Sequence, residues 1–277
     1  QEIEFDADVP IIDPKSDEET ERKNGYAEVF WKKNKRKGFT RYSAQKIMRE
    51  RNYFAAMMVE QGDADALVSG YSRSYPSVFK PMMQVIGMDK NATRVASTNL
   101  LLTHKGPMFF SDTAININPS AQELATIARM TAKTAKLFGV QPVIAMVSYA
   151  NFGSSNFQNA TKVGEAVSYL HHNYPDMVVD GELQVDFALN SEMLKEMFPF
   201  SKLAGKKVNT LIFPNLDAAN ISYKLLKELH STESIGPILM GMAKPAHILQ
   251  LGASVDEIVN MSTIAVLDSQ QRDLKSK

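Results

Sequence analysis

The chain has 277 residues, of which 44% are hydrophobic and 22% charged, a composition that is ordinary for a globular protein and argues against disorder. Lys plus Arg and Asp plus Glu number 31 each, so a net charge of zero argues against a broad nucleic-acid or membrane surface. Without cysteine there is no disulfide, thiolate metal site or cysteine nucleophile. No apolar run approaches the ~20 residues of a membrane span, and we expect a cytoplasmic protein. Because the chain begins with Gln1, we expect a fragment.

In chain order, the pattern first predicts a short strand at 9–12, stopped by Asp13-Pro14, and then an amphipathic helix at 26–33. Lysines follow that helix, and they are interpreted as a solvated helix end capped by Gly38 rather than a nucleic-acid surface. Further on, strands and helices alternate. Strands are expected at 64–70, 95–102, 108–114, 143–148, 177–180, 210–213 and 238–241, and helices at 43–61, 76–86, 120–138, 161–173, 218–230 and 254–267.

Alternating strands and helices predict an α/β fold with a parallel or mixed sheet covered on both faces. In such sheets ligands bind beyond the carboxyl ends of the strands, so the loops at these ends are the candidate binding segments. They are 69–70, 111–112, 148–155, 180–182, 214–220 and 241–252.

The common nucleotide signatures are missing from the sequence. There is no G-x-G-x-x-G after a strand and no G-x-x-x-x-G-K-[ST], which argues against NAD or ATP sites of those types. The histidines show no metal-binding spacing, and the adjacent pair His171-His172 points in different directions on a helix. We therefore expect no metal site.

Three strand-end loops carry polar residues that suit a phosphate. The segment 148–155 supplies glycine, hydroxyls and backbone N–H groups near a helix start, although an ordinary strand–turn–helix connection explains it equally well. In the second loop, Asn215 is followed by Asp217, which could simply cap the next helix. In the third, Lys244 could meet a phosphate, but a solvated loop lysine is the favoured interpretation.

Several long motifs occur in the order found in phosphate acetyltransferases. They are DGELQVD from Asp180, NTLIFPNLDAANISYKL from Asn209, GPILMGMAKP from Gly236 and GASVDEIVN from Gly252, preceded by ADALVSG, SDTAININP and AQELATIA. The chain therefore resembles that family over nearly its whole length. The run SYANFGSS at 148–155 is similar, more narrowly, to the S-x-S-N-F-G-S-S form in the C-terminal domain of large bacterial NADP-dependent malic enzymes, as is AKPAHIL with ASVDEIVNM.

The resemblance implies a two-lobed, three-layer αβα fold of the isocitrate/isopropylmalate dehydrogenase-like type, as in phosphate acetyltransferases. Lobe I is expected at 1–88 and 243–277, with its N-terminal part missing, and lobe II at 89–242, where dimerisation is expected. In the malic enzymes, an N-terminal domain decarboxylates malate to pyruvate with NADP and Mg or Mn, and the domain similar to this chain responds to acetyl-CoA. The resemblance thus implies acetyl-CoA as effector, no cofactor in this domain, a homodimer or higher oligomer, and that N-terminal domain as partner.

Acetyl transfer from CoA to phosphate needs a group that helps to form or receive the CoA thiolate, a group that binds phosphate, and hydrogen-bond donors that stabilise the oxyanion of the tetrahedral intermediate. Active members carry Ser-Arg-Gly where this chain has Gln250, Leu251 and Gly252, and their catalytic aspartate aligns with Glu257. Glu257 is also the third residue of a capping box begun by Ser254. Two further family arginines align with Asn34 and Lys80.

We therefore expect a domain without phosphate acetyltransferase activity that keeps an acetyl-CoA cleft. Two alternatives stay open: an active acyltransferase with an altered site, and a purely structural oligomerisation domain. The residues expected to bind the effector are Ser148, Asn151, Gly153, Ser154, Ser155, Asn215, Lys244 and Gln250.

Overall fold

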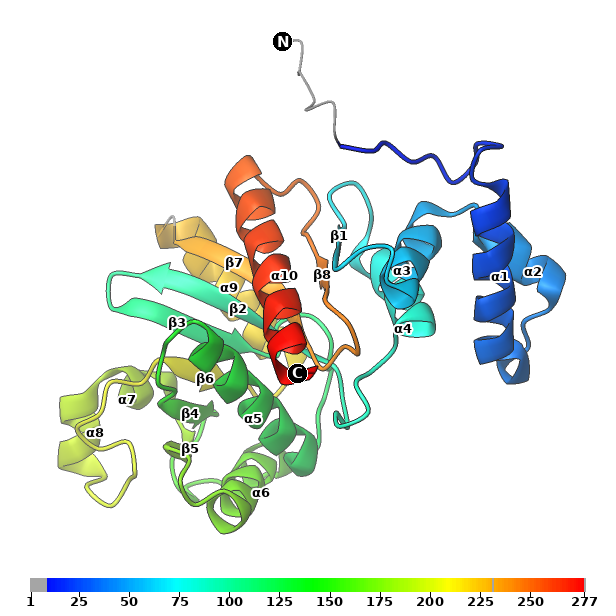
Figure 1. Cartoon of the computed structure of the whole chain (residues 1–277). Helices are drawn as coiled ribbons and strands as arrows, with labels where there is room; N and C mark the ends of the chain where they lie inside the picture. Colours follow the sequence, from blue (N-terminus) through cyan, green and yellow to red (C-terminus); the bar gives the residue numbers. More distant parts are fainter. Residues whose placement is uncertain (1–8, 231, 277) are drawn as a thin grey trace.

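The computed structural model describes residues 9–230 and 232–276, and its larger sheet has six strands in the order β5-β4-β6-β3-β2-β7 (Figure 1). Strands β3, β6, β4 and β5 run parallel to one another, whereas β2 is antiparallel to both β3 and β7. The strands are β2 (Ala96–Thr103), β3 (Gly106–Ser111), β4 (Ile144–Val147), β5 (Val179–Leu183), β6 (Thr210–Ile212) and β7 (Glu233–Met240).

Helices cover both faces of this sheet. On one face lie α5 (Ala121–Leu137) and α6 (Gln158–Asn173), and on the other α7 (Val185–Leu189), α8 (Ser191–Met197) and α9 (Leu216–His230). Strand β4 shows why both faces are covered. Its side chains alternate, so Ile144 and Met146 pack under α5 and α6, while Ala145 and Val147 enter the core under α9. A strand with two apolar faces requires a three-layer arrangement.

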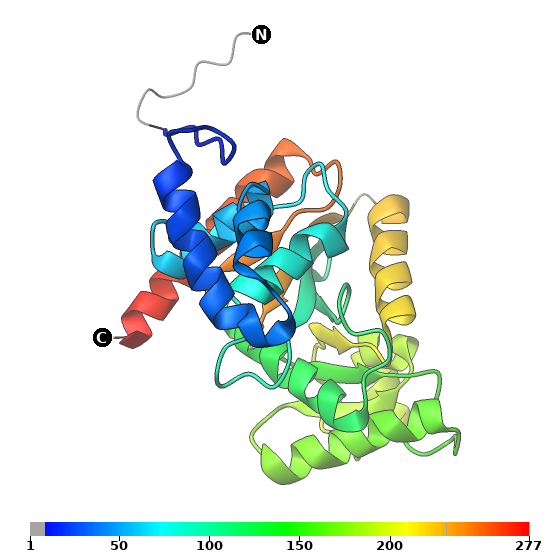
Figure 2. The same cartoon turned by 90° about the vertical axis from the view of Figure 1, so that its right-hand side faces the viewer.

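A second sheet pairs two short strands, β1 (Leu67–Ser69) and β8 (Ala246–Ile248), in parallel. The first helices share one apolar core with β8, whose centre includes Phe30, Phe54 and Ile248. Figure 2 shows these helices gathered at one end of the molecule, with α6 at the other. The last helix, α10 (Val255–Ser276), contacts β1, β8 and β7 and so links the two sheets. The helices of this end are α1 (Thr20–Asn34), η1 (Lys35–Lys37), α2 (Arg41–Ile47), α3 (Arg51–Gln61) and α4 (Tyr75–Val85).

The prediction of an α/β fold with a mixed sheet covered on both faces is confirmed. Local signals are confirmed as well. Ser120 caps α5 through a reciprocal capping box with Glu123, and Gly38 ends η1 with a φ of 88°, in the left-handed region that glycine adopts without strain. The proposed lobe boundaries at residues 88/89 and 242/243 stay a prediction.

Some predicted elements are wrong. The segment 9–12 is not a strand, and its Val9 and Ile11 side chains are exposed to solvent. The expected helix 43–61 is two helices, because the Glu50 carboxylate accepts the backbone N–H groups of Asn52 and Tyr53 and starts α3 afresh. The expected loop 180–182 lies inside β5. Helices α7 and α8 and strand β8 were not predicted.

Candidate functional site

The loop after β4, residues 148–155, folds against strand β5. The Phe152 N–H donates to the Glu182 carbonyl oxygen at 2.9 Å, and the Gly153 N–H donates to the Glu182 carboxylate. Asn151 accepts the Gln184 N–H at 2.7 Å through its side-chain oxygen. The backbone N–H groups of Phe152 and Gly153 are therefore already bonded inside the protein, and a ligand phosphate would have to displace Glu182 to reach Gly153.

The hydroxyls of this loop differ in their availability. Ser154 accepts the Asn151 N–H at 3.0 Å, and Ser155 lies 2.9 Å from the Tyr149 hydroxyl. The Ser148 hydroxyl is buried and has no hydrogen-bond partner among the described residues. Among the loop residues expected to bind the effector, Ser148 is thus the one with a buried side-chain polar atom that has no partner among the described residues. The assignment of this loop to acetyl-CoA stays a prediction.

Asn215 and Lys244 have structural partners. The Asn215 side-chain oxygen accepts the Ala218 N–H at 2.9 Å, so Asn215, rather than Asp217, caps α9. The Lys244 ammonium donates to the Val59 carbonyl at 3.0 Å, near the C-terminal end of α3, where a cation also meets the negative end of the helix dipole. These bonds use the Asn215 side-chain oxygen and one of the three N–H donors of Lys244, so, among the described residues, the Asn215 side-chain NH2 group and the other lysine donors stay open to a ligand.

Replacing Asn215 with alanine is expected to lower the free energy of unfolding by about 1 kcal/mol, because the first turn of α9 loses its cap. The measurement is urea denaturation followed by circular dichroism. Asp217→Ala is the matched control in the same turn, and because Asp217 is exposed it is expected to cost only a few tenths of a kcal/mol. Equal losses in the two variants would contradict the assignment of the cap to Asn215.

The altered family positions after β8 are tied to α9. The Gln250 amide donates to the Tyr223 hydroxyl at 3.0 Å, and the Lys227 ammonium lies 2.8 Å from the Glu257 carboxylate. Tyr223 and Lys227 are one helical turn apart, so both contacts use the same face of α9. Leu251, which lies between Gln250 and Glu257 in the chain, is 73% exposed and its side chain has no polar group. The structure therefore joins Gln250 and Glu257 to α9 and leaves the leucine facing solvent.

Glu257 also caps α10, as the sequence predicts: its carboxylate accepts the Ser254 N–H at 2.8 Å, and its own N–H donates to the Ser254 hydroxyl at 3.2 Å. Partial burial raises the pKa of Glu257, but the hydrogen bonds from Lys227 and Ser254 outweigh it, so the net pKa lies below its ordinary value. A carboxyl group held ionised in this way accepts hydrogen bonds and is a poor proton donor.

Asn34 and Lys80 are not joined to this cluster by any hydrogen bond or ion pair among the described residues. Asn34 is fully buried at the end of α1, where its amide donates to the Phe30 carbonyl at 3.1 Å and the Gln84 carbonyl at 3.3 Å. Lys80 is exposed on α4. The predicted altered positions thus form two groups: a cluster around Gln250, Leu251 and Glu257, and two separate positions on α1 and α4.

Two tyrosines near this cluster were not anticipated. Burial raises the pKa of Tyr75, as do the nearby Asp112 and Tyr223, and its buried hydroxyl has no partner among the described residues. Burial also raises the pKa of Tyr223, against the Gln250 hydrogen bond that lowers it. A tyrosine on a helix gives no functional signal in a sequence, because packing alone explains it. The sequence did offer one feature near these tyrosines, because the candidate loop 111–112 contains Asp112, which lies near Tyr75.

No group of three or more His, Asp or Glu side chains among the described residues is placed to hold a metal ion. None of the helices described is both long and apolar enough to cross a membrane.

Comparison with known proteins identifies the relatives. The family model "Phosphate acetyl/butaryl transferase" matches residues 1–266. The NADP-dependent malic enzyme of Haemophilus influenzae is 39% identical over 243 residues, which are 87% of this chain and 32% of that protein. The phosphate acetyltransferase of Clostridium acetobutylicum is 37% identical over 268 residues, 94% of this chain and 79% of that protein. A phosphotransacetylase structure from Streptococcus pyogenes has a TM-score of 0.80 at 36% identity, covering 94% of this chain and 77% of that one.

The chain spans about a third of the length of the malic enzymes it matches, and about four fifths of the phosphate acetyltransferases. These matches confirm the resemblance found in the motifs. The chain therefore belongs to the phosphate acetyl/butaryl transferase family, with relatives among the phosphate acetyltransferases and in the C-terminal part of NADP-dependent malic enzymes.

Proposed function

We propose that this chain is the phosphotransacetylase-like regulatory domain of an NADP-dependent malic enzyme, and that it binds acetyl-CoA without transferring the acetyl group. The observation that carries the proposal is Leu251, which stands exposed where the resemblance places an arginine in active enzymes. An arginine holds phosphate through its charge and planar fork of donors. A leucine offers neither, so inorganic phosphate has lost its partner at this position.

The neighbours of Leu251 support the same conclusion. Gln250 occupies the position of the family serine, and its side-chain amide donates a hydrogen bond to the Tyr223 hydroxyl. Glu257 occupies the position of the family aspartate and is held ionised by Lys227 and by its capping bonds. Losing a single oxyanion-type donor costs roughly 10²–10³ in rate. The rate losses from several substitutions at one site do not simply multiply. Together, however, these substitutions remove most of the groups that acetyl transfer needs.

Acetyl-CoA binding has separate support. The hydroxyls of Tyr75 and Ser148 are buried without a partner among the described residues, and such groups favour a ligand that brings hydrogen-bonding atoms. A ligand entering between α9 and the loop after β8 must rearrange the Gln250–Tyr223 or Lys227–Glu257 contact. Binding would thereby shift that loop relative to α9, and typical allosteric couplings of about 1–3 kcal/mol are of the size such a rearrangement provides.

The proposal extends to the protein that would contain this domain. An N-terminal part would convert malate to pyruvate with NADP and Mg or Mn, and acetyl-CoA bound here would change its activity. The chain would adopt the two-lobed isocitrate/isopropylmalate dehydrogenase-like arrangement, for which its two separate sheets are the support. It would dimerise through residues 89–242 and act in the cytoplasm.

Two other functions are considered. An active phosphate acetyltransferase is favoured by the match to those enzymes, which extends over about four fifths of their length at similar identity. A purely structural oligomerisation domain would need neither activity nor a ligand. Activity separates the first alternative from the proposal, and acetyl-CoA binding separates the second.

The test combines an assay and a titration on the purified chain. We expect no acetyl phosphate from acetyl-CoA and phosphate above background, with the Clostridium acetobutylicum enzyme as positive control. Isothermal titration with acetyl-CoA is expected to give a dissociation constant on the order of 1 mM or tighter. Robust acetyl phosphate formation would establish the acyltransferase alternative, and no heat at millimolar acetyl-CoA would leave only the structural one.

A matched pair of variants tests the route of coupling. Lys227→Gln removes the ion pair to Glu257 and is expected to change acetyl-CoA affinity several-fold, because the loop after β8 is released from α9. Lys224→Gln changes the same charge at an exposed position on the same helix and is expected to leave the affinity unchanged. Equal responses would exclude the Lys227–Glu257 contact from the coupling.

A further inference from the structure

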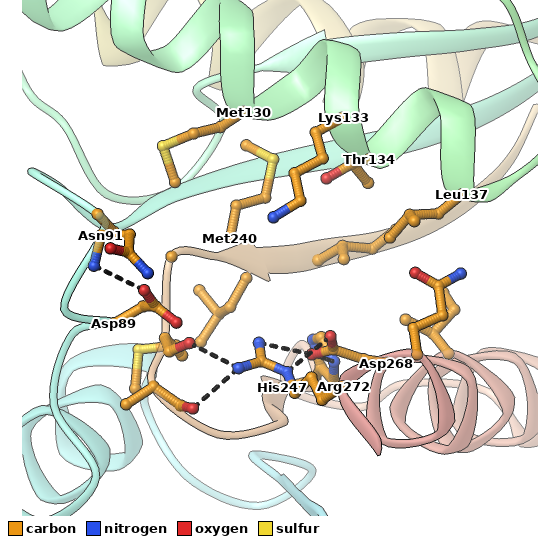
Figure 3. A pocket seen from close by; sticks show the side chains of 18 of the residues that line it. Asp89, Asn91, Met130, Lys133, Thr134, Leu137, Met240, His247, Asp268 and Arg272 are labelled. Carbon is orange, nitrogen blue, oxygen red and sulfur yellow. Dashed lines mark hydrogen bonds and ion pairs between the residues drawn. The ribbon is translucent and has the colours of Figure 1, made fainter. Parts of the chain in front are cut away.

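A cavity of about 750 Å³ lies between α5, β7 and α10, on the opposite face of the six-stranded sheet from α9 and the Gln250–Leu251 segment (Figure 3). Its size falls in the range of about 300–1,000 Å³ that is typical of small-molecule sites. None of the residues expected to bind acetyl-CoA lines it. The cavity is thus separate from the site of the proposed function.

One side of the cavity is apolar. Met130 and Leu137 of α5 face Met240 of β7 (Figure 3), and Leu267 of α10 also lines the cavity. Methionine side chains adapt to the shape of what they contact, so two of them suit a flexible hydrocarbon body. Apolar surface of this kind is the usual lining of an organic ligand's site.

The charged groups on the α10 side are already paired. Arg272 meets both carboxylate oxygens of Asp268, at 2.9 and 3.2 Å, and also donates to the carbonyls of Met242 at 3.1 Å and Ala243 at 2.9 Å. With its donors used in this way, Arg272 shapes the wall and its charge is balanced by Asp268. The pair itself therefore leaves little net charge for a ligand.

Lys133 is different. Figure 3 shows its ammonium group extending from α5 into the cavity, beside Thr134. No carboxylate among the described side chains lies within ion-pair distance of it. Lys133 is exposed as a residue, but its side chain lines the cavity beside apolar groups, so its charge can attract an anion that enters there. Lys133 with Thr134 therefore forms a place for an anionic head group.

His247 gives a second, independent indication. It lines the cavity, its side chain is almost wholly buried, and neither ring nitrogen has a hydrogen-bond partner among the described residues. Burial lowers the pKa of His247 to about 4, so the ring is neutral at pH 7 and its 3.8 Å approach to Asp268 is not an ion pair there. Unpaired buried nitrogens are costly, by about 1–3 kcal/mol each, and are stabilised by a ligand that bonds to them.

We propose that this cavity binds an amphipathic carboxylate, with the carboxylate at Lys133 and Thr134 and the hydrocarbon chain along Met130, Leu137 and Met240. The neutral His247 also lines the cavity, and its ring nitrogens are available as partners for a further polar group. This would be a second ligand site, with an anionic head and an apolar tail as its recognition features. It is independent of whether acetyl-CoA binds near α9.

The test uses three probes with the same hydrocarbon chain and different head groups: octanoate, octanol and octylamine. With the whole chain labelled at its methionine methyls, octanoate is expected to shift the NMR signals of Met130 and Met240. Octylamine is expected to bind at least about tenfold more weakly, because its head group repels Lys133, and octanol is expected to lie between them.

Variants locate the head group. Lys133→Gln is expected to weaken octanoate binding at least about fivefold and to leave octanol binding unchanged. Lys136→Gln, one turn along the same exposed face of α5 but outside the cavity, is expected to behave as wild type. Equal affinities for octanoate and octylamine, shifts confined to other methionines, or an unaffected Lys133→Gln would each overturn the proposal. Acetyl-CoA shifting Met130 and Met240 would overturn the independence of the two sites.

Discussion

Replacing Asp112 with alanine is expected to lower the free energy of unfolding by at least about 3 kcal/mol, because several buried donors would lose their acceptor at once. The Asp112 carboxylate follows β3 and is almost wholly buried. It accepts backbone N–H groups from Ser97 at 3.2 Å, Ala114 at 3.1 Å, Ile115 at 3.2 Å and Asn116 at 3.0 Å. The Ser97 hydroxyl and the Asn116 amide also donate to it.

The measurement is urea denaturation, with Asp112→Asn as the matched variant. Asparagine keeps one oxygen acceptor and the shape of the side chain, so a loss between those of wild type and alanine is expected. A loss below about 1 kcal/mol for alanine would contradict the view that this carboxylate holds the turn after β3. The expected effect of the Asp112 variants is on the stability of the fold around Tyr75, so it is measured by unfolding and not by a catalytic assay.

The second large effect is a loss of stability on acidification, by about 3 kcal/mol between pH 6.5 and pH 4, attributable to His247. Its pKa is about 4 in the folded protein, lowered by burial and by Arg272 against the opposing Asp268, and 6.5 is its ordinary value. Between pH 4 and pH 6.5, His247 is protonated in the unfolded chain but stays neutral in the folded protein. Stability therefore falls as the pH drops through this window and is unaffected by His247 above it.

Urea midpoints at pH 7, 5.5 and 4.5 measure this slope, with His247→Leu as the test. Leucine does not titrate, so the variant is expected to lose less stability than wild type on acidification. At pH 7 it is expected to be at least as stable, since two unpaired buried nitrogens are removed. His172→Asn, at an exposed position, is expected to keep the wild-type slope. The pKa of Glu257 is lowered from its ordinary value of 4.5, so the stability that this carboxylate contributes at neutral pH is lost mainly as the pH falls below about 4.5.

Elements with a local signal could be predicted from the sequence, and elements that depend on distant partners could not. Helix α5 has its capping box and apolar stripe within the helix itself, and both were read correctly. Strand β8 has three residues and exists because it pairs with β1, far away in the chain. The break before α3 depends on a single side chain, Glu50, which gives no signal against an apolar pattern that continues past it.

The candidate site shows the same division. The family motifs led to Gln250, Leu251 and Glu257, and two of these do share α9 as their partner. The partners themselves, Tyr223 and Lys227, could not be predicted from the sequence. Tertiary packing decides which residues of a helix face a given loop. Lys244 shows this most clearly, since its acceptor, the carbonyl of Val59, lies 185 residues away. The cavity around His247 likewise forms only where α5, β7 and α10 meet.

The pairing of β1 with β8 has a consequence for synthesis. Leu67 leaves the ribosome nearly 180 residues before its partner Ala246. At about 5–20 residues per second, this interval lasts roughly ten to forty seconds. During it, the apolar surfaces of the first four helices lack Ile248 and Met242 to complete their core. We expect the nascent chain to be most prone to aggregation in that interval. Ribosome-bound chains that stop after Asn220 are expected to be far more protease-sensitive in residues 20–90 than the completed chain after its release.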